Sequence, residues 1–147
     1  MQLTRSWYVV EHSSAVPAGS VRRLDFHGQV FALWRALDGT LSVVSDRCPH
    51  KGASLSAGRV GKEGLACPYH GWCFQADGHC AKIPAQDSAQ AIPRRAQAFS
   101  LPCRESVGFI WIWWDPSAES SAEDLPPLPC FPRYALKDWT SSSGTKR

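Results

Sequence analysis

Short apolar stretches separated by turn residues dominate the first 116 residues of the chain. Runs of about four to eight apolar or alternating residues bounded by Gly, Pro, Asn or Asp are typical of β-strands. The expected strands are 7–10, 21–26, 29–36, 40–45, 65–66, 72–74, 80–83, 96–101 and 107–114. Apart from one short turn expected after Asp87, no stretch has a helical period. The pattern therefore predicts a mostly β domain.

Two dipeptides mark the tightest expected turns. His27-Gly28 separates the second and third strands, and Asp38-Gly39 separates the third and fourth. Asp-Gly is a strong signal for a type I′ hairpin. In the strand at 29–36, apolar residues occupy both sets of alternate positions, so we expect this strand to be covered on both faces.

The composition changes towards the C-terminus. Pro, Ser, Ala and Glu dominate from 115 to 132, with Pro126, Pro127 and Pro129 close together. Such a composition is typical of an extended linker or tail. We therefore predict a domain at 1–116 and a Pro/Ser-rich linker or tail at 117–147.

Composition and charge narrow the function classes. A chain of 147 residues with seven Trp and six Phe is one ordinary domain that can bury a core. The net charge of +3 is mild and the basic residues are scattered, so a solvated surface is favoured over a nucleic-acid patch. A basic face could still help docking to an acidic redox partner. No signal peptide or long apolar run is visible, which predicts a cytoplasmic protein without a membrane anchor.

Two short segments carry the candidate chemistry: Cys-Pro-His at 48–50 and Cys-Pro-Tyr-His at 67–70. Sixteen residues separate them, and Gly52 and Gly71 follow the two histidines at short offsets. Two thiolates and two imidazoles fit a Rieske [2Fe–2S] centre, in which two histidines replace two cysteines on one iron. The candidate cluster and metal ligands are therefore Cys48, His50, Cys67 and His70.

Zinc is the main competing interpretation, because zinc also accepts two sulfur and two nitrogen ligands. Zinc motifs usually pair Cys with Cys and His with His, whereas each segment here carries one of each. A third interpretation is four unrelated residues, since cysteine is commonly buried and inert. The doubled Cys-Pro…His…Gly pattern favours the iron–sulfur interpretation over both.

At these residues the chain resembles a known family. Segments 48–53 and 67–72 resemble the two cluster-binding loops of Rieske non-haem iron oxygenases of the aromatic-ring-hydroxylating type. Weaker similarities to the same domain follow at 55–60, 77–78, 83–86 and 107–114. The resemblance covers roughly residues 5 to 116.

The resemblance implies a fold, a cofactor and a ligand arrangement. The expected fold is a Rieske-type antiparallel β-sandwich with two cluster-binding loops at one end, holding one [2Fe–2S] cluster. By resemblance, Cys48 and Cys67 bind one iron, and His50 and His70 bind the other. The residues expected to surround the ligands are Lys51, Gly52, Tyr69, Gly71 and Trp72.

The resemblance also favours one branch of the superfamily. High-potential Rieske proteins carry an extra cysteine in each loop, and Ser and Tyr donors to the cluster sulfurs. The corresponding positions here look like Ala53 and Tyr69 for the cysteines, and Trp72 and Phe74 for the donors. Fewer hydrogen bonds to sulfur stabilise the reduced state less. The chain therefore resembles the low-potential oxygenase or ferredoxin branch.

A complete oxygenase of this type also holds a mononuclear iron on a 2-His-1-carboxylate triad. No histidine follows His79 in this sequence, so that second site cannot be built after it. We therefore expect an oxidoreductase component that passes single electrons from a reductase or ferredoxin towards a separate oxygenase catalytic domain or subunit. As an isolated chain it should not be catalytic.

Two other functions remain as alternatives to this interpretation. A free-standing Rieske ferredoxin is the main alternative, and a non-redox zinc-binding module is a remote one. We expect no nucleic-acid or membrane partner, and a homo-oligomer is compatible with the resemblance. The remaining histidines are expected in turns or on the surface, and the remaining cysteines as free thiols: His12, His27, His79, Cys73, Cys80, Cys103 and Cys130.

Overall fold

The computed structural model describes residues 3–87, 89–117 and 124–129. Within them the chain forms eleven strands and two short 3-10 turns, arranged in three antiparallel sheets. The strands are β1 (Ser6–His12), β2 (Val21–Phe26), β3 (Gln29–Arg35), β4 (Leu41–Ser45), β5 (Arg59–Gly61), β6 (Gly64–Ala66), β7 (Cys73–Phe74), β8 (Cys80–Lys82), β9 (Ser100–Leu101), β10 (Cys103–Ser106) and β11 (Phe109–Trp114). The turns are η1 (Ser13–Ala15) and η2 (Leu55–Ala57).

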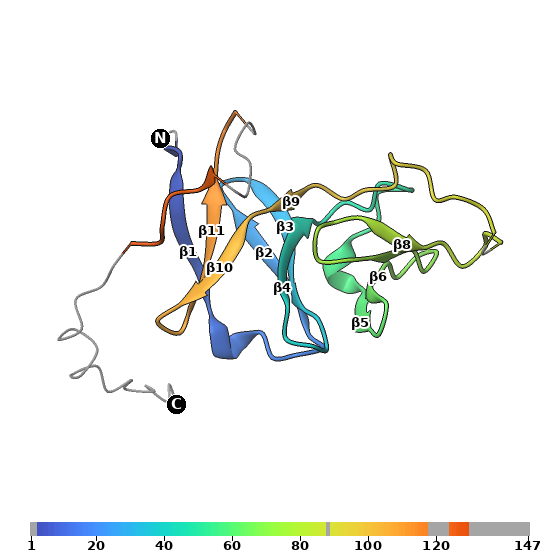
Figure 1. Ribbon diagram of the computed structural model, residues 1–147, viewed down its shortest axis with the longest axis horizontal. Coiled ribbons are helices and arrows are strands. Elements are labelled where there is room, and N and C mark those ends of the chain that lie inside the picture. The colour runs from blue at the N-terminus through green and yellow to red at the C-terminus, as the bar shows by residue number, and fades with distance from the viewer. Residues whose placement is uncertain (1–2, 88, 118–123, 130–147) are drawn as a thin grey trace.

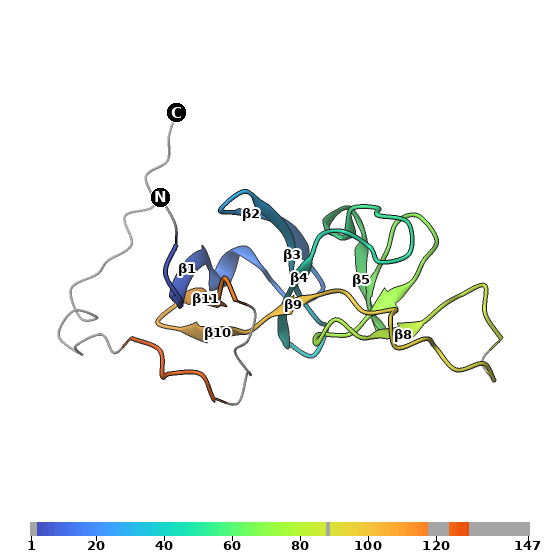
Figure 2. The same cartoon turned by 90° about the horizontal axis from the view of Figure 1, so that it is seen from above.

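The three sheets follow one another along the molecule (Figures 1 and 2). Sheet β1-β11-β10 lies at one end, sheet β2-β3-β4-β9 lies in the middle, and sheet β5-β6-β7-β8 lies at the other end. No helix in the described residues is long and apolar enough to cross a membrane. The prediction of a mostly β, antiparallel fold is confirmed.

Strands β3 and β4 supply side chains to two different cores. Residues on alternate sides of a strand point to opposite faces of the sheet, and both faces of this pair are buried. One face joins a core of Val16, Phe31, Leu33, Val43, Leu101, Ile110, Ile112 and Trp114. The other joins a core of Ala32, Trp34, Val44, Cys48, Leu55, Leu65, Cys67, Phe74, Cys80, Ala96 and Ala98. The expectation that this strand is covered on both faces is confirmed.

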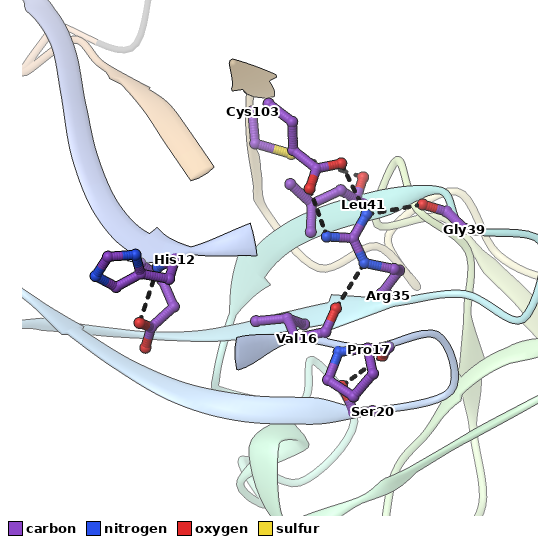
Figure 3. A network of polar contacts seen from close by, with 10 residues as sticks. His12, Val16, Pro17, Ser20, Arg35, Gly39, Leu41 and Cys103 are labelled. Atoms are coloured by element: carbon purple, nitrogen blue, oxygen red, sulfur yellow. Dashed lines mark hydrogen bonds and ion pairs between the residues drawn. The ribbon is translucent and has the colours of Figure 1, made fainter. Parts of the chain in front are cut away.

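Arg35, at the end of β3, connects the middle sheet to neighbouring segments through hydrogen bonds (Figure 3). Its Nε donates to the Val16 carbonyl at 2.6 Å, and one terminal nitrogen donates to the Gly39 carbonyl at 3.1 Å. The two terminal nitrogens also bind both oxygens of Glu105 on β10, at 2.6 and 2.7 Å. This fork-shaped pair joins two sheets through one guanidinium.

Residues 124–129 lie against the outer face of the β1-β11-β10 sheet. That face carries Trp7, Trp111 and Trp113, and two leucines of the segment, Leu125 and Leu128, pack on it. The Trp7 Nε1 donates to the Pro126 carbonyl at 2.8 Å. This stretch of the expected linker is therefore in contact with the β-domain.

Several expected elements are confirmed and others are wrong. The strands at 21–26, 29–36 and 40–45 are present almost as predicted. Val107 and Gly108 were expected in a strand but form the β10–β11 turn, with φ of +57° and +78°. Of the strand expected at 96–101, only Ser100–Leu101 pairs with β4, because the Ala96 carbonyl accepts from Cys80 on β8 and the Ala98 amide donates to Gly78 in the β7–β8 turn. Cys130 and most of the expected linker lie outside the described residues.

Candidate metal centre

Two loops bring the four candidate ligands together. Loop one, residues 48–53, follows β4 and precedes η2, while loop two, residues 67–72, connects β6 to β7. Pairing of Ala66 with Cys73 places the two ends of loop two on neighbouring strands. The ends of loop one, Arg47 and Ser54, meet only in a single isolated antiparallel bridge and not in a strand pair, so they need a further anchor.

Asp46 supplies that anchor. Its side chain is buried, and its carboxylate accepts hydrogen bonds from the Ser54 hydroxyl and, at 2.6 Å, from the Ser56 amide. Its backbone carbonyl accepts from the Leu55 amide at 2.7 Å, and its backbone amide donates to Val30 at 3.0 Å. These bonds join the chain before loop one to the chain after it. Sequence reasoning missed Asp46; the only local signal is an acid followed eight and ten residues later by serines.

The two loops close with the same hydrogen-bond pattern. The amide of the cysteine donates to the carbonyl five residues later, at 2.9 Å in loop one and 2.8 Å in loop two. The amide of the glycine donates back to the carbonyl of the cysteine, at 2.8 and 3.1 Å. The pairs are Cys48 with Ala53 and Gly52, and Cys67 with Trp72 and Gly71.

Gly52 and Gly71 occupy equivalent positions, with φ of +75° and +71°. This left-handed conformation is unfavourable for residues with a Cβ. A Cβ at Gly71 would also lie 3.1 Å from the Cγ of Pro84, so space is short there. The glycine expected in each loop is therefore required by the backbone.

The two cysteines lie side by side at the base of the loops. Both are buried, and both belong to the core of the β5–β8 half. Burial raises the pKa of the Cys48 thiol to about 11, the backbone amide of His50 opposes this, and the neighbouring Cys67 side chain adds to it. A metal ion that takes up the thiolates would supply the positive charge that this buried pair lacks.

The two histidines lie above the cysteines, towards the solvent. The rings of His50 and His70 are in contact, with centroids 4.7 Å apart at 65°. Trp72 stacks on His50 at 4.5 Å with the planes only 6° apart, and Tyr69 packs on His70 at 3.8 Å. Partial burial lowers the pKa of His50, and the charges of His70 and Lys51 lower it further. A neutral imidazole is the form that binds metal.

The donor set fits a two-iron cluster. A Rieske centre takes two cysteine sulfurs on one iron and two histidine nitrogens on the other. The loops present a buried sulfur pair and a more exposed nitrogen pair, each with one member per loop. Among the described residues, no three or more His, Cys, Asp or Glu side chains gather around a single position that could hold one metal ion.

The other histidines and thiols that the structure describes are not part of the two loops. His12 packs on Phe109 at 4.8 Å, His27 lies 6.5 Å from Trp114, and His79 is exposed beside the β7–β8 turn. Every cysteine in the described part of the chain is a free thiol. Cys80 pairs with Phe74 across the strands, and Cys73 pairs with Lys82, so the two thiols are not opposite each other.

The sequence of this chain is similar to those of known proteins. A sequence model of the Rieske [2Fe-2S] domain matches residues 6–102. Chlorophyllide a oxygenase of Chlamydomonas reinhardtii is 36% identical over 124 residues, covering 84% of this chain and 18% of that protein. 4beta-methylsterol monooxygenase of Methylococcus capsulatus is 36% identical over 125 residues, covering 84% of this chain and 34% of that protein.

Two solved structures are also similar to this chain in fold and in sequence. The crystal structure of apo dicamba monooxygenase superposes with a TM-score of 0.68 at 31% identity, covering 84% of this chain and 37% of that one. NdmA of Pseudomonas putida CBB5 superposes with a TM-score of 0.69 at 30% identity, covering 77% and 35%. This chain thus spans well under half the length of the proteins that it matches.

Proposed function

The chain belongs to the Rieske [2Fe–2S] domain family, and from this premise we propose that it is the electron-transfer domain of a ring-hydroxylating oxygenase system. Its homology to oxygenase Rieske domains implies electron transfer within such a system. In more detail, we propose that the domain passes single electrons from a reductase or ferredoxin towards a mononuclear-iron oxygenase centre. The domain boundary at 116 and the cytoplasmic location stay predictions.

The observation that carries the proposal is the pair of equivalent loops. Cys48 and Cys67 would hold one iron, and His50 and His70 the other, as the donor types require. Both loops have the same backbone closure, and their side chains form one sulfur pair and one imidazole pair. Four unrelated residues have no physical reason to share this arrangement.

When bound, the cluster supplies one-electron redox chemistry at a potential raised by its histidine ligands. The protein's part is to hold and shield the donors. Backbone amides of His50 and Lys51 point at the Cys48 sulfur, which stabilises negative charge there. Burial of both cysteines excludes water from the sulfur side, whereas the exposed His70 ring leaves a short path to a partner at the surface.

The low reduction potential expected for the cluster is consistent with the side chains around the loops. Trp72 and Phe74 occupy the positions where a high-potential protein is expected to carry hydroxyl donors, and neither has one. Trp72 is instead stacked on His50, and Phe74 is fully buried in the core. Fewer donors to the cluster sulfurs lower the reduction potential.

Reconstitution tests the proposed function. The purified chain, loaded anaerobically with iron and sulfide, should be red-brown and give a Rieske-type EPR signal after reduction with dithionite. It should then reduce an oxygenase catalytic domain that lacks its own Rieske domain. A chain that stays colourless and takes up no iron and sulfide would refute the proposal. A cluster-loaded chain that passes electrons only between a reductase and complete oxygenases would favour the free-standing ferredoxin.

A further inference from the structure

The segment that carries both loops has an uneven distribution of charge. Between residues 46 and 72 there are four cations and two acids. The cations are Arg47, Lys51, Arg59 and Lys62, and none of them takes part in an ion pair among the described residues. Of the acids, Asp46 is buried and hydrogen-bonded, and Glu63 pairs with Lys82 at 2.9 Å. The exposed charge of this segment is therefore positive.

One cation lies beside each loop. Lys51 directly follows His50 in loop one, and its positive charge helps to lower the pKa of that imidazole. Arg59, on β5, lines a hollow of about 370 Å³ together with Tyr69 and Pro68 of loop two. Because the two histidine rings touch, each loop of the candidate centre has one cation close to it.

The two histidines differ in their access to a partner. His50 is half-buried under the stacked ring of Trp72, whereas His70 is exposed. Tyr69, which packs on His70, is itself 66% exposed, a high value for a large aromatic side chain. An exposed aromatic beside a groove, flanked by cations, is the surface that a partner with an apolar spot and surrounding carboxylates would fit.

We propose that an acidic electron-donor protein docks over Tyr69 and His70, guided by Lys51 and Arg59. This proposal rests on the function proposed above and names the partner of that same site. In the step itself, the reduced donor would lose one electron and become oxidised by one unit, and the cluster that Cys48, His50, Cys67 and His70 would hold would take up that electron. No bond forms or breaks. The cations speed the encounter, and Tyr69 supplies the desolvated contact.

Stopped-flow reduction of the cluster-loaded chain by an acidic plant-type [2Fe–2S] ferredoxin tests the proposal. Plant-type ferredoxins have lower reduction potentials than Rieske centres, so the electron moves downhill. Rates are measured at ionic strengths of about 0.01 and 1 M, where the screening length is about 30 and 3 Å. The variant is Lys51→Glu/Arg59→Glu; the control, Arg22→Glu/Arg104→Glu, makes the same change in net charge on β2 and β10.

We expect the Lys51→Glu/Arg59→Glu variant to react about tenfold or more slowly than the wild type at low ionic strength. The difference should largely vanish at high ionic strength, and the control should stay within about twofold of the wild type. Tyr69→Ser should slow the reaction at both ionic strengths without changing the reduction potential. Equal rates for the wild type and the double variant, or equal slowing by the control, would overturn the proposal.

Dithionite separates this proposal from the proposed function. If dithionite produces the reduced-state EPR signal in every variant, the centre is intact, and a rate difference that vanishes at high ionic strength belongs to docking. If dithionite produces no such signal in the wild type, the proposed function fails before docking is tested.

Discussion

Cys48 and Cys67 are the side chains on which the candidate centre depends most directly. Replacing either by Ser removes one of two adjacent sulfur donors from a buried position. We expect both variants to lose the reduced-state EPR signal after reconstitution, because a hydroxyl is a poor substitute for a thiolate in iron–sulfur binding. Cys73→Ser is the matched control: its thiol is also buried but donates to the Gly71 carbonyl at 3.3 Å. Unchanged signals in both cysteine variants would refute the ligand assignment.

Asp46 should matter for stability even without a cluster. Asp46→Asn replaces a charged double acceptor by a group that can accept only through one oxygen, and Ser54 and Ser56 lose part of their partner. We expect the unfolding free energy, measured by urea titration of the apo protein, to fall by about 1–3 kcal/mol. Asp25→Asn removes an exposed pair with Arg23 and should cost clearly less than Asp46→Asn. Equal losses would contradict the anchoring role.

The ligands could be predicted from spacing, whereas their supports could not. Cys48 and His50 lie two residues apart, so a local motif is enough to identify them. The role of Asp46 depends on where Ser54 and Ser56 fold back, which no spacing rule specifies. The stacking of Trp72 on His50 likewise joins two loops far apart in sequence.

Strand β10 is joined to β3 through Arg35 and Glu105, and this pair should make stability depend on pH. The hydrogen bonds from Arg35 lower the pKa of Glu105 below its ordinary value of 4.5. A carboxyl with a lowered pKa stabilises the folded state while it is ionised, and this contribution is lost as the pH falls through the folded-state pKa.

Glu105→Gln tests that pH dependence. We expect the variant to be less stable than the wild type near neutral pH, by less than about 1 kcal/mol because Glu105 is partly exposed. The difference should shrink steadily as the pH falls below 4.5, the ordinary value for this carboxyl. A difference that stays constant down to strongly acidic pH would show that the ionised pair is not its source.

At the level of elements, turns with glycine were the most reliable sequence signals. His27-Gly28 correctly predicted the β2–β3 hairpin, with φ of +48° and +77°. Val107-Gly108 is equally a turn, but the strong strand propensity of the apolar run after it hid the signal. Strand β5 was missed because Arg59–Gly61 contains a single apolar residue and pairs only as part of a small sheet.

The whole described domain should unfold as one unit, because β3 and β4 form one wall of both cores. Leu33→Ala removes a fully buried side chain from the core distant from the loops, at a cost of about 2–5 kcal/mol. In the reconstituted protein we expect it to lower the temperature at which visible cluster absorption is lost, together with the far-UV circular dichroism transition. Val9→Ala, at an exposed position, should change neither by more than a small amount. Cluster loss unaffected by Leu33→Ala would contradict this coupling.

The two loops close with the same backbone hydrogen bonds, but the histidine is the third residue of loop one and the fourth residue of loop two. Equivalent backbone frames therefore carry inequivalent imidazoles, one sheltered by an indole and the other open to water. Magnetic resonance of the reduced centre should resolve two distinct nitrogen hyperfine couplings. In heavy water, the ring N–H of His70 should take up deuterium before that of His50. Indistinguishable couplings and exchange rates would mean that the two rings are equivalent in solution.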